Sequence, residues 1–539
     1  MRKDLFHGGL VPSAKSPVSS SSPGVARPAG LSLLPLETLS PEMTRRVFVN
    51  RHLRMDHIEV IGFDMDYTLA LYNQPKLEAL SADCTIDKMI ARRGYPEALR
   101  ALPYDARRAI RGLVVDRDRG NLLKMDRYGY VGRAYHGTQV LSRGERRKLY
   151  REQLVRILPT HYAWLDTLFA LPEAVLYAQL VDHYEKDAAF LALPGDQKKE
   201  KYSQIWADIR ESIDEAHRDD SIKRVIKADP GQYIVFDPDL PATLHRFRSA
   251  GKRLFLLTNS GLDYTQAVMS FLLDKRLSGY ASWRSYFDVI VVDAKKPSFF
   301  TEQAPLLQLD ADGKAVGEID GKKAASRGRL CQGGNVQALD RLLGLRGDRV
   351  LYVGDHIYGD MYRAKRASVW RTAMIIQELE AEIQNQKRVE AELQMLEALE
   401  RRRHRLEADL RYNRLLWRTV IEQGHEDAQL PLFGAHTGSD VEKQTGEEVQ
   451  ADLRKHSDAL RVRLRETDDD MDRLEQDIEQ AFNPFWGPLL KAAAENSRFG
   501  QQVEDFACVY TSRVSNFLQY APFQHFRSPR DHLPHERVY

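Results

Sequence analysis

Short apolar runs that end in polar residues recur along this chain of 539 residues and predict buried β-strands. The first run is HIEVIGFDMD at residues 57–66. The others are KRLFLLTNS (252–260), FDVIVVDAKKP (287–297) and DRVLYVGDH (348–356). Between these later runs lie amphipathic helical patterns, at residues 263–273 and 335–345. Strands that alternate with helices predict an α/β fold with a parallel sheet.

Helical periodicity dominates the rest of the chain. Between residues 85 and 229 the pattern is mostly helical, apart from a hairpin predicted at 120–137, where glycines punctuate an alternating sequence. A capped helix is predicted at residues 39–52. Two long charged segments, 377–417 and 449–482, carry Leu and Ile at spacings of three and four, which predicts an antiparallel helical hairpin. Such a stripe is typical of a packing seam, against the sheet domain or another subunit.

These patterns predict how the chain is divided. Residues 1–38 are rich in Ser, Pro, Gly and Ala, a composition that cannot bury a core, and we expect a disordered leader there. The sheet domain is expected to be interrupted by a large insert and followed by the hairpin and an aromatic-rich end that packs on the body. The expected boundaries are 39–75 and 241–376 for the sheet domain, 76–240 for the insert, 377–485 for the hairpin and 486–539 for the end.

Composition narrows the class of protein. Hydrophobic residues at 43% and charged residues at 29% indicate a folded globular chain. A net charge of only +2 does not indicate a nucleic-acid-binding protein, and the apolar runs are far shorter than the ~20 residues that span a membrane. The N-terminus lacks the apolar core of a secretory signal, and the three cysteines lie far apart, which fits a reducing cytoplasm.

The polar strand ends are the candidate site. Asp64 and Asp66 by themselves are either polar residues at the end of a strand that have no function, or a pair of functional groups in a site. In parallel sheets, however, ligands bind beyond the carboxyl ends of the strands, so all four ends are expected to meet. Carboxylates gathered there would repel one another without a cation, and such oxygen-rich sites favour Mg²⁺. Hydroxyl, amide and lysine groups then suit a phosphate. The other residues at these ends are Thr258, Asn259, Lys295, Lys296, Asp355 and Asp360.

Four motifs in order, DMDYTL, LLTNS, AKKP and VGDHIYGD, resemble those of the haloacid dehalogenase superfamily. The longer strings FDMDYTLALY, NLLKMDRYG, LLTNSGLDYT, VDAKKPSFF, LYVGDHIYGDM and LPHE resemble the cytosolic purine 5′-nucleotidase family of the IMP/GMP-specific type, over roughly residues 40–539. The resemblance implies a Rossmann-like haloacid dehalogenase core with a parallel sheet. It also implies that the insert 76–240 is a large, mostly helical cap for substrate recognition, and that the long helical hairpin is C-terminal to the core.

The resemblance also implies catalytic roles. Asp64 would be the nucleophile that forms an aspartyl-phosphate, and Asp66 would protonate the leaving oxygen and then deprotonate water. Magnesium would be held by Asp64, the backbone carbonyl of Asp66, and Asp355. Asp360 would support that shell, with a simple capping or surface role as its alternative. The groups expected on the phosphate are Thr258, Asn259, Ser260 and Lys296, the last chosen because it directly precedes the proline.

For the nucleobase, the pattern of the family's purine-contacting helix implies Arg210, Asp214, His217 and Lys223, and an aromatic at Tyr358 could stack on the purine. Arg210 and Asp214 are four positions apart, which also fits an ordinary exposed ion pair.

The resulting prediction is a Mg²⁺-dependent 5′-nucleotidase for purine nucleoside monophosphates, cytoplasmic and homo-oligomeric as a dimer or tetramer. A phosphotransferase activity is implied as well, because a nucleoside hydroxyl can intercept the phosphoenzyme. One alternative is a phosphatase of the same superfamily for another phosphorylated metabolite. The other is a non-catalytic assembly protein on this fold, with the long helices as its interaction surface.

Overall fold

A computed structural model describes residues 41–150, 160–319, 326–344, 347–422, 446–530 and 533–536. The predicted disordered leader, residues 1–38, lies outside these ranges. The chain divides into two compact units, Met1–Glu42 and Met43–Tyr539, and the helices and strands discussed below belong to the second. Because residues 43–539 form one unit, the finer division into core, cap, hairpin and C-terminal part stays a prediction.

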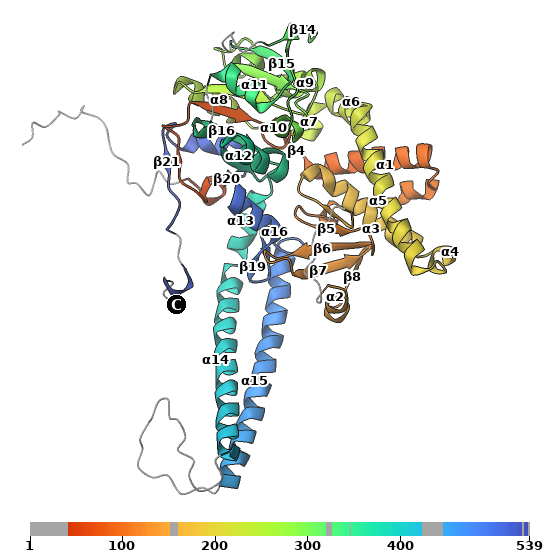
Figure 1. Ribbon diagram of the computed structural model, residues 1–539, viewed down its shortest axis with the longest axis vertical. Helices are drawn as coiled ribbons and strands as arrows, with labels where there is room; N and C mark the ends of the chain where they lie inside the picture. The colour runs from red at the N-terminus through yellow and green to blue at the C-terminus, as the bar shows by residue number, and fades with distance from the viewer. Residues whose placement is uncertain are drawn as a thin grey trace, which may run out of the picture. The chain divides into compact units, whose positions relative to one another are not determined.

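A ten-stranded sheet is the centre of this unit (Figure 1). The four strands predicted from the sequence lie side by side in the order β16-β3-β11-β12 and pair in parallel, so the predicted α/β class with a parallel sheet is confirmed. In spatial order the strands are Phe48–Val49 (β1), Val509–Thr511 (β20), Arg371–Ile375 (β17), Val350–Gly354 (β16), Val60–Phe63 (β3), Arg253–Leu257 (β11), Val289–Val292 (β12), Arg329–Gly333 (β15), Leu306–Leu309 (β13) and Ala315–Glu318 (β14).

Both faces of the sheet are buried, which explains the nearly continuous apolar runs. Successive residues of a strand point to opposite faces. Ile61 and Phe63 therefore pack in one hydrophobic cluster, whereas Val60 packs in another with Phe255 and Tyr352. The helices between the strands supply the covering side chains, and they are Leu240–Ser249 (α8), Leu262–Leu273 (α9), Val336–Leu343 (α11) and Arg363–Ser368 (α12).

The insert between β3 and β11 is less helical than predicted. Its helices include Gln74–Arg93 (α1), Leu171–Tyr184 (α3), Gly195–Arg218 (α5) and Ser221–Ala228 (α6). It also holds a five-stranded antiparallel sheet in the order β8-β7-β6-β5-β9. The predicted hairpin is β6–β7, but β5 pairs with β9, a partner that local periodicity does not reveal. These strands are Gln139–Val140 (β8), Val131–His136 (β7), Asn121–Met125 (β6), Val114–Asp116 (β5) and Tyr162–Trp164 (β9).

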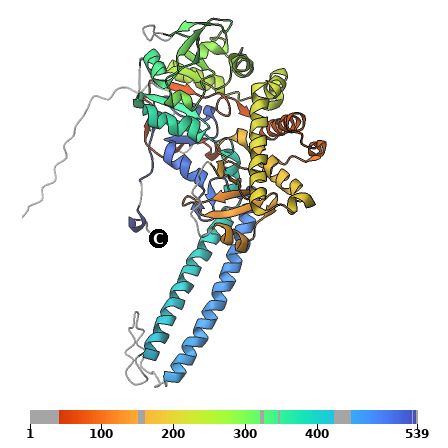
Figure 2. The same cartoon turned by 45° about the vertical axis from the view of Figure 1, so that its right-hand side comes forward.

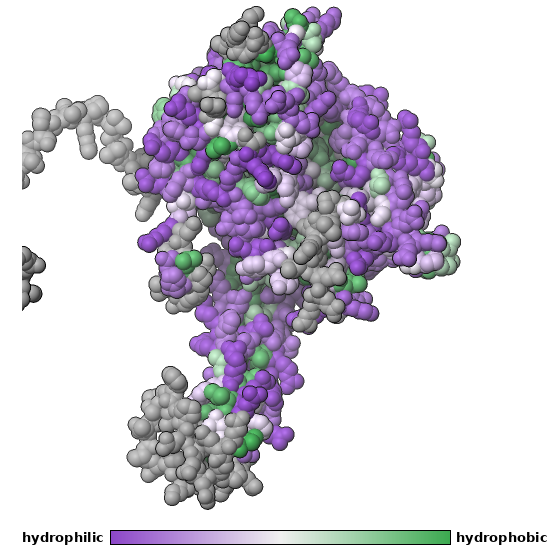
Figure 3. Space-filling view, viewed as in Figure 1, coloured by the Kyte–Doolittle hydropathy of each residue, from purple (hydrophilic) through white to green (hydrophobic). Residues whose placement is uncertain are grey.

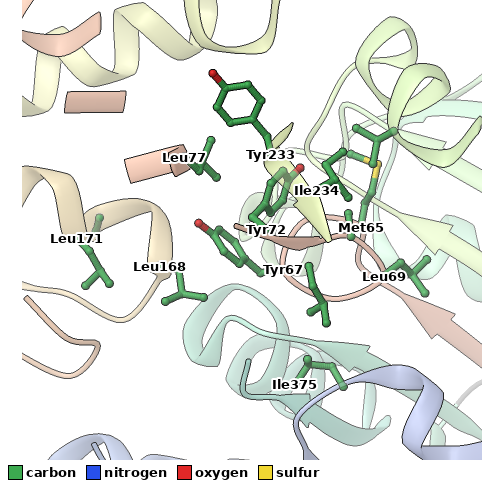
Figure 4. Close-up of a cluster of buried hydrophobic side chains, with 14 of the residues drawn as sticks. Met65, Tyr67, Leu69, Tyr72, Leu77, Leu168, Leu171, Tyr233, Ile234 and Ile375 are labelled. Atoms are coloured by element: carbon green, nitrogen blue, oxygen red, sulfur yellow. The ribbon is translucent and has the colours of Figure 1, made fainter. Parts of the chain in front are cut away.

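Two short strands join the insert to the sheet region. Leu71–Tyr72 (β4) follows β3 and leads into the insert, and Ile234–Val235 (β10) leads from the insert back to the sheet. The two strands pair antiparallel. Figure 4 shows Tyr72 and Ile234 at this crossing, close to Met65 and Tyr67 of the loop after β3. The loop after β3, which carries the candidate residues Asp64 and Asp66, therefore runs directly into the connection between the sheet and the insert.

The predicted helical hairpin is present. Helices Glu390–Glu422 (α14) and Gly446–Ala481 (α15) run side by side in both views (Figures 1 and 2). Their seam buries Leu406, Leu410 and Leu460. A separate helix, Leu379–Arg388 (α13), precedes them, so the single helix predicted from residue 377 is interrupted at Val389.

The helix predicted at residues 39–52 is wrong over the described part. A single 3₁₀ turn, Met43–Arg45 (η2), is followed by β1, which pairs antiparallel with β20 near the C-terminus. Phe48 faces Tyr510 across this pair, and their rings stack at 5.2 Å. Pairing with a distant strand has thus overridden the local helical signal.

The view in Figure 3 is mainly hydrophilic, with apolar residues scattered over it. Among the described residues, no helix has the length and apolar character needed to cross a bilayer.

Candidate active site

The polar ends of the parallel strands meet at one edge of the sheet. The backbone N–H of Asp64 donates to the carbonyl of Val353 at 2.9 Å, and that of Thr258 donates to Val291 at 2.9 Å, so ladder bonds set the positions of both residues. Carboxylate oxygens of Asp64, Asp355 and Asp360 all lie within 4.8 Å of one another. The structure therefore gathers three of the predicted carboxylates at one point.

A tight turn over residues 65–70 follows Asp64 and contains Asp66. The Met65 carbonyl accepts the N–H groups of Thr68, Leu69 and Ala70 at 3.3, 3.0 and 2.9 Å. Tyr67 takes a φ of 56°, the left-handed region that side chains rarely occupy, and such backbone strain clusters at functional sites. The turn buries the side chain of Met65, and Asp64 just before it is buried as well.

Lys296 is the cation of the cluster. Its Nζ lies 2.8 Å from Asp64 Oδ1, 2.8 Å from Asp360 Oδ1 and 3.1 Å from the Tyr352 hydroxyl. Burial by itself lowers the pKa of Lys296, but the two carboxylates outweigh it and hold the pKa well above its ordinary value. The ammonium group is therefore charged, and Lys296 rather than the exposed Lys295 stands in the site.

The carboxylates carry more negative charge than Lys296 can balance. Burial, and then Asp360, raise the pKa of Asp355 to about 7. Burial also raises the pKa of Asp64 well above its usual range, against the opposing effect of Lys296. Asp355 Oδ2 is buried and has no hydrogen-bond partner within the described part of the chain. A buried, unpaired carboxylate oxygen beside two further carboxylates fits a hard divalent cation.

Asp360 connects this cluster to its surroundings through several hydrogen bonds. Its Oδ1 accepts from Lys296 and, at 3.2 Å, from Tyr352, and its Oδ2 accepts the N–H of His356 at 3.3 Å. The side chain is only 1% exposed. Asp360 lies within a short π-helical segment, Ile357–Tyr362 (η8), in which the Met361 N–H donates to the His356 carbonyl at 3.2 Å. This burial excludes the surface role considered for Asp360, whereas its contact with the His356 N–H is of the capping kind that was the other alternative.

The predicted phosphate-binding residues surround the same edge, but one of them has its side chain engaged elsewhere. Both polar atoms of the Asn259 side chain bind the backbone of Lys296, at 2.6 and 2.9 Å. Asn259 therefore holds two strand ends together, and one N–H of its side-chain amide is left for the phosphate contact expected of it. Thr258 Oγ1 accepts the Ser260 N–H, and Ser260 Oγ donates to Asp66 Oδ2 at 2.9 Å.

The predicted base-contacting residues are spread over a wider area. Arg210 pairs with the buried Glu173 at 3.0 Å, and no pair with Asp214 occurs among the described residues. The His217 ring packs edge-on against Phe169 at 5.8 Å, and burial lowers the pKa of His217 to about 4, which leaves the ring neutral at pH 7. Lys223 Nζ lies 5.4 Å from the centroid of the Tyr264 ring.

Two aromatic residues differ in their relation to the site. Phe169, which the sequence did not single out, contacts Tyr67 at 4.7 Å and Tyr72 at 6.4 Å, and so connects His217 to the catalytic loop. Tyr358 is 39% exposed, and its hydroxyl accepts from Gln502 at 3.2 Å. Within this structure it adjoins the C-terminal segment and not Phe169 or His217.

Comparison with known proteins gives the family of this chain. The sequence model of the 5′-nucleotidase family matches residues 47–538. The chain belongs to the 5′-nucleotidase family. It is 29% identical, over 511 residues, to a 5′-nucleotidase domain-containing protein of Dictyostelium discoideum, with 93% of this chain and 76% of that protein covered. The family resemblance and the enzyme class predicted from the motifs are thereby confirmed.

A solved structure also matches. It is a 2-haloacid dehalogenase from Pseudomonas syringae, with 59% of this chain and 86% of that chain covered, at 14% sequence identity and a TM-score of 0.21. A superposition this loose adds nothing to what the sheet order of this nucleotidase shows directly.

Two further residues of the insert bind the segment of this nucleotidase that carries Asp355 and His356. The fully buried Arg111 donates to the backbone carbonyl of Asp355 at 3.1 Å and forms a two-point ion pair with Glu378. Asp166 binds His356 Nε2 at 2.9 Å and, although burial opposes it, raises the pKa of His356 to about 9. The partners are 244 and 190 positions apart in sequence, so no local motif could have indicated them.

Gly354, the last residue of β16, leaves the space that Asp360 fills. A Cβ at Gly354 would lie 2.5 Å from Asp360 Oδ2. We expect Gly354→Ala to lower the free energy of unfolding by about 1–3 kcal/mol and to reduce nucleotidase activity at least ~tenfold, because Asp360 and with it Lys296 must shift. Urea unfolding and phosphate release measure the two effects.

Gly317→Ala on β14 is the matched control, because nothing lies within 4 Å of the added Cβ there. Wild-type activity in Gly354→Ala would contradict the role assigned to this close approach.

Proposed function

We propose that this 5′-nucleotidase is Mg²⁺-dependent and hydrolyses purine nucleoside 5′-monophosphates, IMP or GMP preferentially, through an aspartyl-phosphate on Asp64. The observation that carries the proposal is the cluster of Asp64, Asp355 and Asp360 around Lys296, with one buried carboxylate oxygen unpaired. Such a site has more carboxyl groups than Lys296 can pair with, which suits a divalent cation, and with the cation it can accept a phosphate.

The chemistry divides between the two aspartates. An Asp64 oxygen attacks phosphorus, the bond to the ribose 5′-oxygen breaks, and Asp66 gives that oxygen a proton. Water then attacks the aspartyl-phosphate, Asp66 takes its proton, and phosphate leaves with Asp64 restored. When bound, Mg²⁺ would neutralise charge on the phosphoryl oxygens; Asp64, Asp355, the Asp66 carbonyl and, behind them, Asp360 would hold it. Lys296 adds a second positive charge at the same oxygens.

The substrate preference rests on the insert. Phe169 and the neutral ring of His217 lie edge to face next to the catalytic turn, and they are the aromatic groups proposed to contact the purine. Arg210, Asp214 and Lys223 are the polar groups proposed around that base, and Tyr358 is kept as a more distant candidate. If a nucleoside hydroxyl replaces water in the second step, the same site acts as a phosphotransferase. Cytoplasmic location and a homo-oligomeric dimer or tetramer stay predictions.

We expect purified protein to release phosphate from IMP and GMP only when Mg²⁺ is present, and Asp64→Asn to lose at least about 1,000-fold in kcat because the nucleophile is gone. A malachite-green phosphate assay over a panel of nucleotides measures this. Asp458→Asn, an exposed change on α15, is the control and should keep full activity. Wild-type protein that releases no phosphate from any nucleotide would favour the non-catalytic assembly protein.

We expect the affinity of the site for Mg²⁺ to fall as the pH is lowered. Because the pKa of Asp355 is raised to about 7 in the metal-free protein, lowering the pH protonates a proposed ligand, and Mg²⁺ must displace that proton. We expect the apparent Kd for Mg²⁺ to be about tenfold higher at pH 6 than at pH 8. Isothermal titration calorimetry in buffers of different ionisation enthalpy measures both the affinity and the proton release. An affinity that is equal at the two pH values would contradict Asp355 as a ligand.

The purine assignment is tested separately from the chemistry. We expect Asp214→Ala to lower kcat/KM for IMP about tenfold, with little change for an aryl phosphate that lacks a base. Glu211→Ala is the control, since Glu211 lies on the same helix but pairs with Arg93 on its surface. Equal hydrolysis of IMP by wild type and Asp214→Ala would favour a phosphatase for another metabolite.

A further inference from the structure

Both carboxylate oxygens of Asp66 are held by hydroxyl groups. The Tyr72 hydroxyl donates to Oδ1 at 2.5 Å, and Ser260 donates to Oδ2 at 2.9 Å. Tyr72 is 1% exposed and lies on β4, the strand that leads from the catalytic turn into the insert. Figure 4 shows Tyr72 next to Tyr67, and their rings are 5.0 Å apart. The side chain of Asp66 is thus fixed at two points.

A second tyrosine backs the first. The hydroxyls of Tyr72 and Tyr264 are 2.9 Å apart, and because the Tyr72 proton is donated to Asp66, Tyr264 is the donor of this second hydrogen bond. Tyr264 lies on α9 of the sheet region and is 6% exposed, and Lys223 of the insert stands over its ring. A chain of contacts therefore runs from the insert through Tyr264 and Tyr72 to Asp66.

Burial alone does not give every tyrosine hydroxyl of this protein a hydrogen-bond partner. Tyr177 and Tyr286 are also buried, and their hydroxyls have no hydrogen-bond partner among the residues that the structure describes. Tyr72 instead makes two hydrogen bonds, one of them with a group proposed to transfer protons. A phenol also differs from Lys296, because its hydroxyl can donate or accept and so can orient a carboxyl group in either protonation state.

We propose that Tyr72, oriented by Tyr264, is a positioning residue for Asp66 and aims its carboxyl group at the leaving oxygen. The inference rests on the acid role proposed above for Asp66. A general acid must lie within hydrogen-bond reach of the atom that it protonates, so the loss of a fixed orientation lowers the rate of the protonated step selectively.

The test exploits the leaving group. The ribose 5′-oxygen of IMP is a poor leaving group that needs a proton, whereas the nitrophenolate of p-nitrophenyl phosphate leaves without one. Because kcat/KM reports only the steps up to formation of the phosphoenzyme, it isolates the step that uses the acid. We expect Tyr72→Phe to lower kcat/KM about tenfold for IMP and less than about twofold for p-nitrophenyl phosphate. Tyr264→Phe should show the same selectivity with a smaller loss, about threefold.

Tyr286→Phe is the matched control, because it removes a buried hydroxyl without a partner in the described chain and should change neither substrate. Equal losses for both substrates in Tyr72→Phe, or no loss for either, would overturn the inference while leaving the proposed function standing. Wild-type protein that hydrolyses neither substrate with Mg²⁺ would overturn the proposed function and the inference together. Tyr264→Phe, a change outside the catalytic turn, keeps the test decisive if Tyr72→Phe unfolds.

Discussion

The contact of Lys296 with Asp64 and Asp360 is the interaction on which the rest of the site depends. Three carboxylates at a buried sheet edge repel one another, and the desolvation of each adds to that cost. One ammonium group at 2.8 Å from two of them offsets part of the repulsion and leaves the third, Asp355, with an unpaired oxygen. The imbalance that remains is what makes the edge a receptor for a cation and, through it, for phosphate.

The surrounding structure holds this arrangement in place from several directions. Gly354 gives Asp360 the room to reach Lys296, and Asn259 ties the Lys296 backbone to the neighbouring strand end. From the insert, Arg111 and Asp166 bind the loop that carries Asp355 and His356. The insert thus contacts the site through these polar groups and through the ring of Phe169, which packs against Tyr67.

Asp66 and Asp64 have partners of different charge. Asp64 faces the ammonium group of Lys296, which opposes the rise in pKa that burial imposes on this carboxyl group. Asp66 faces two hydroxyls, which suit a group that changes its charge during turnover. Two aspartates that are two positions apart are thus given separate chemical environments, Asp64 by Lys296 after β12 and Asp66 by residues from β4, α9 and the end of β11.

The sequence by itself determined the central parallel strands, because burial on both faces demands unbroken apolar runs, and it determined the candidate cluster, because parallel strands end at one edge. It also determined the family, through motifs at those ends. Only the tertiary structure decided the edge strand β1, the antiparallel sheet of the insert, and the roles of Arg111, Asp166, Phe169 and Tyr264. The physical reason is that each of these depends on a partner far along the chain, and periodicity records only which face a residue buries, not which distant group will meet it.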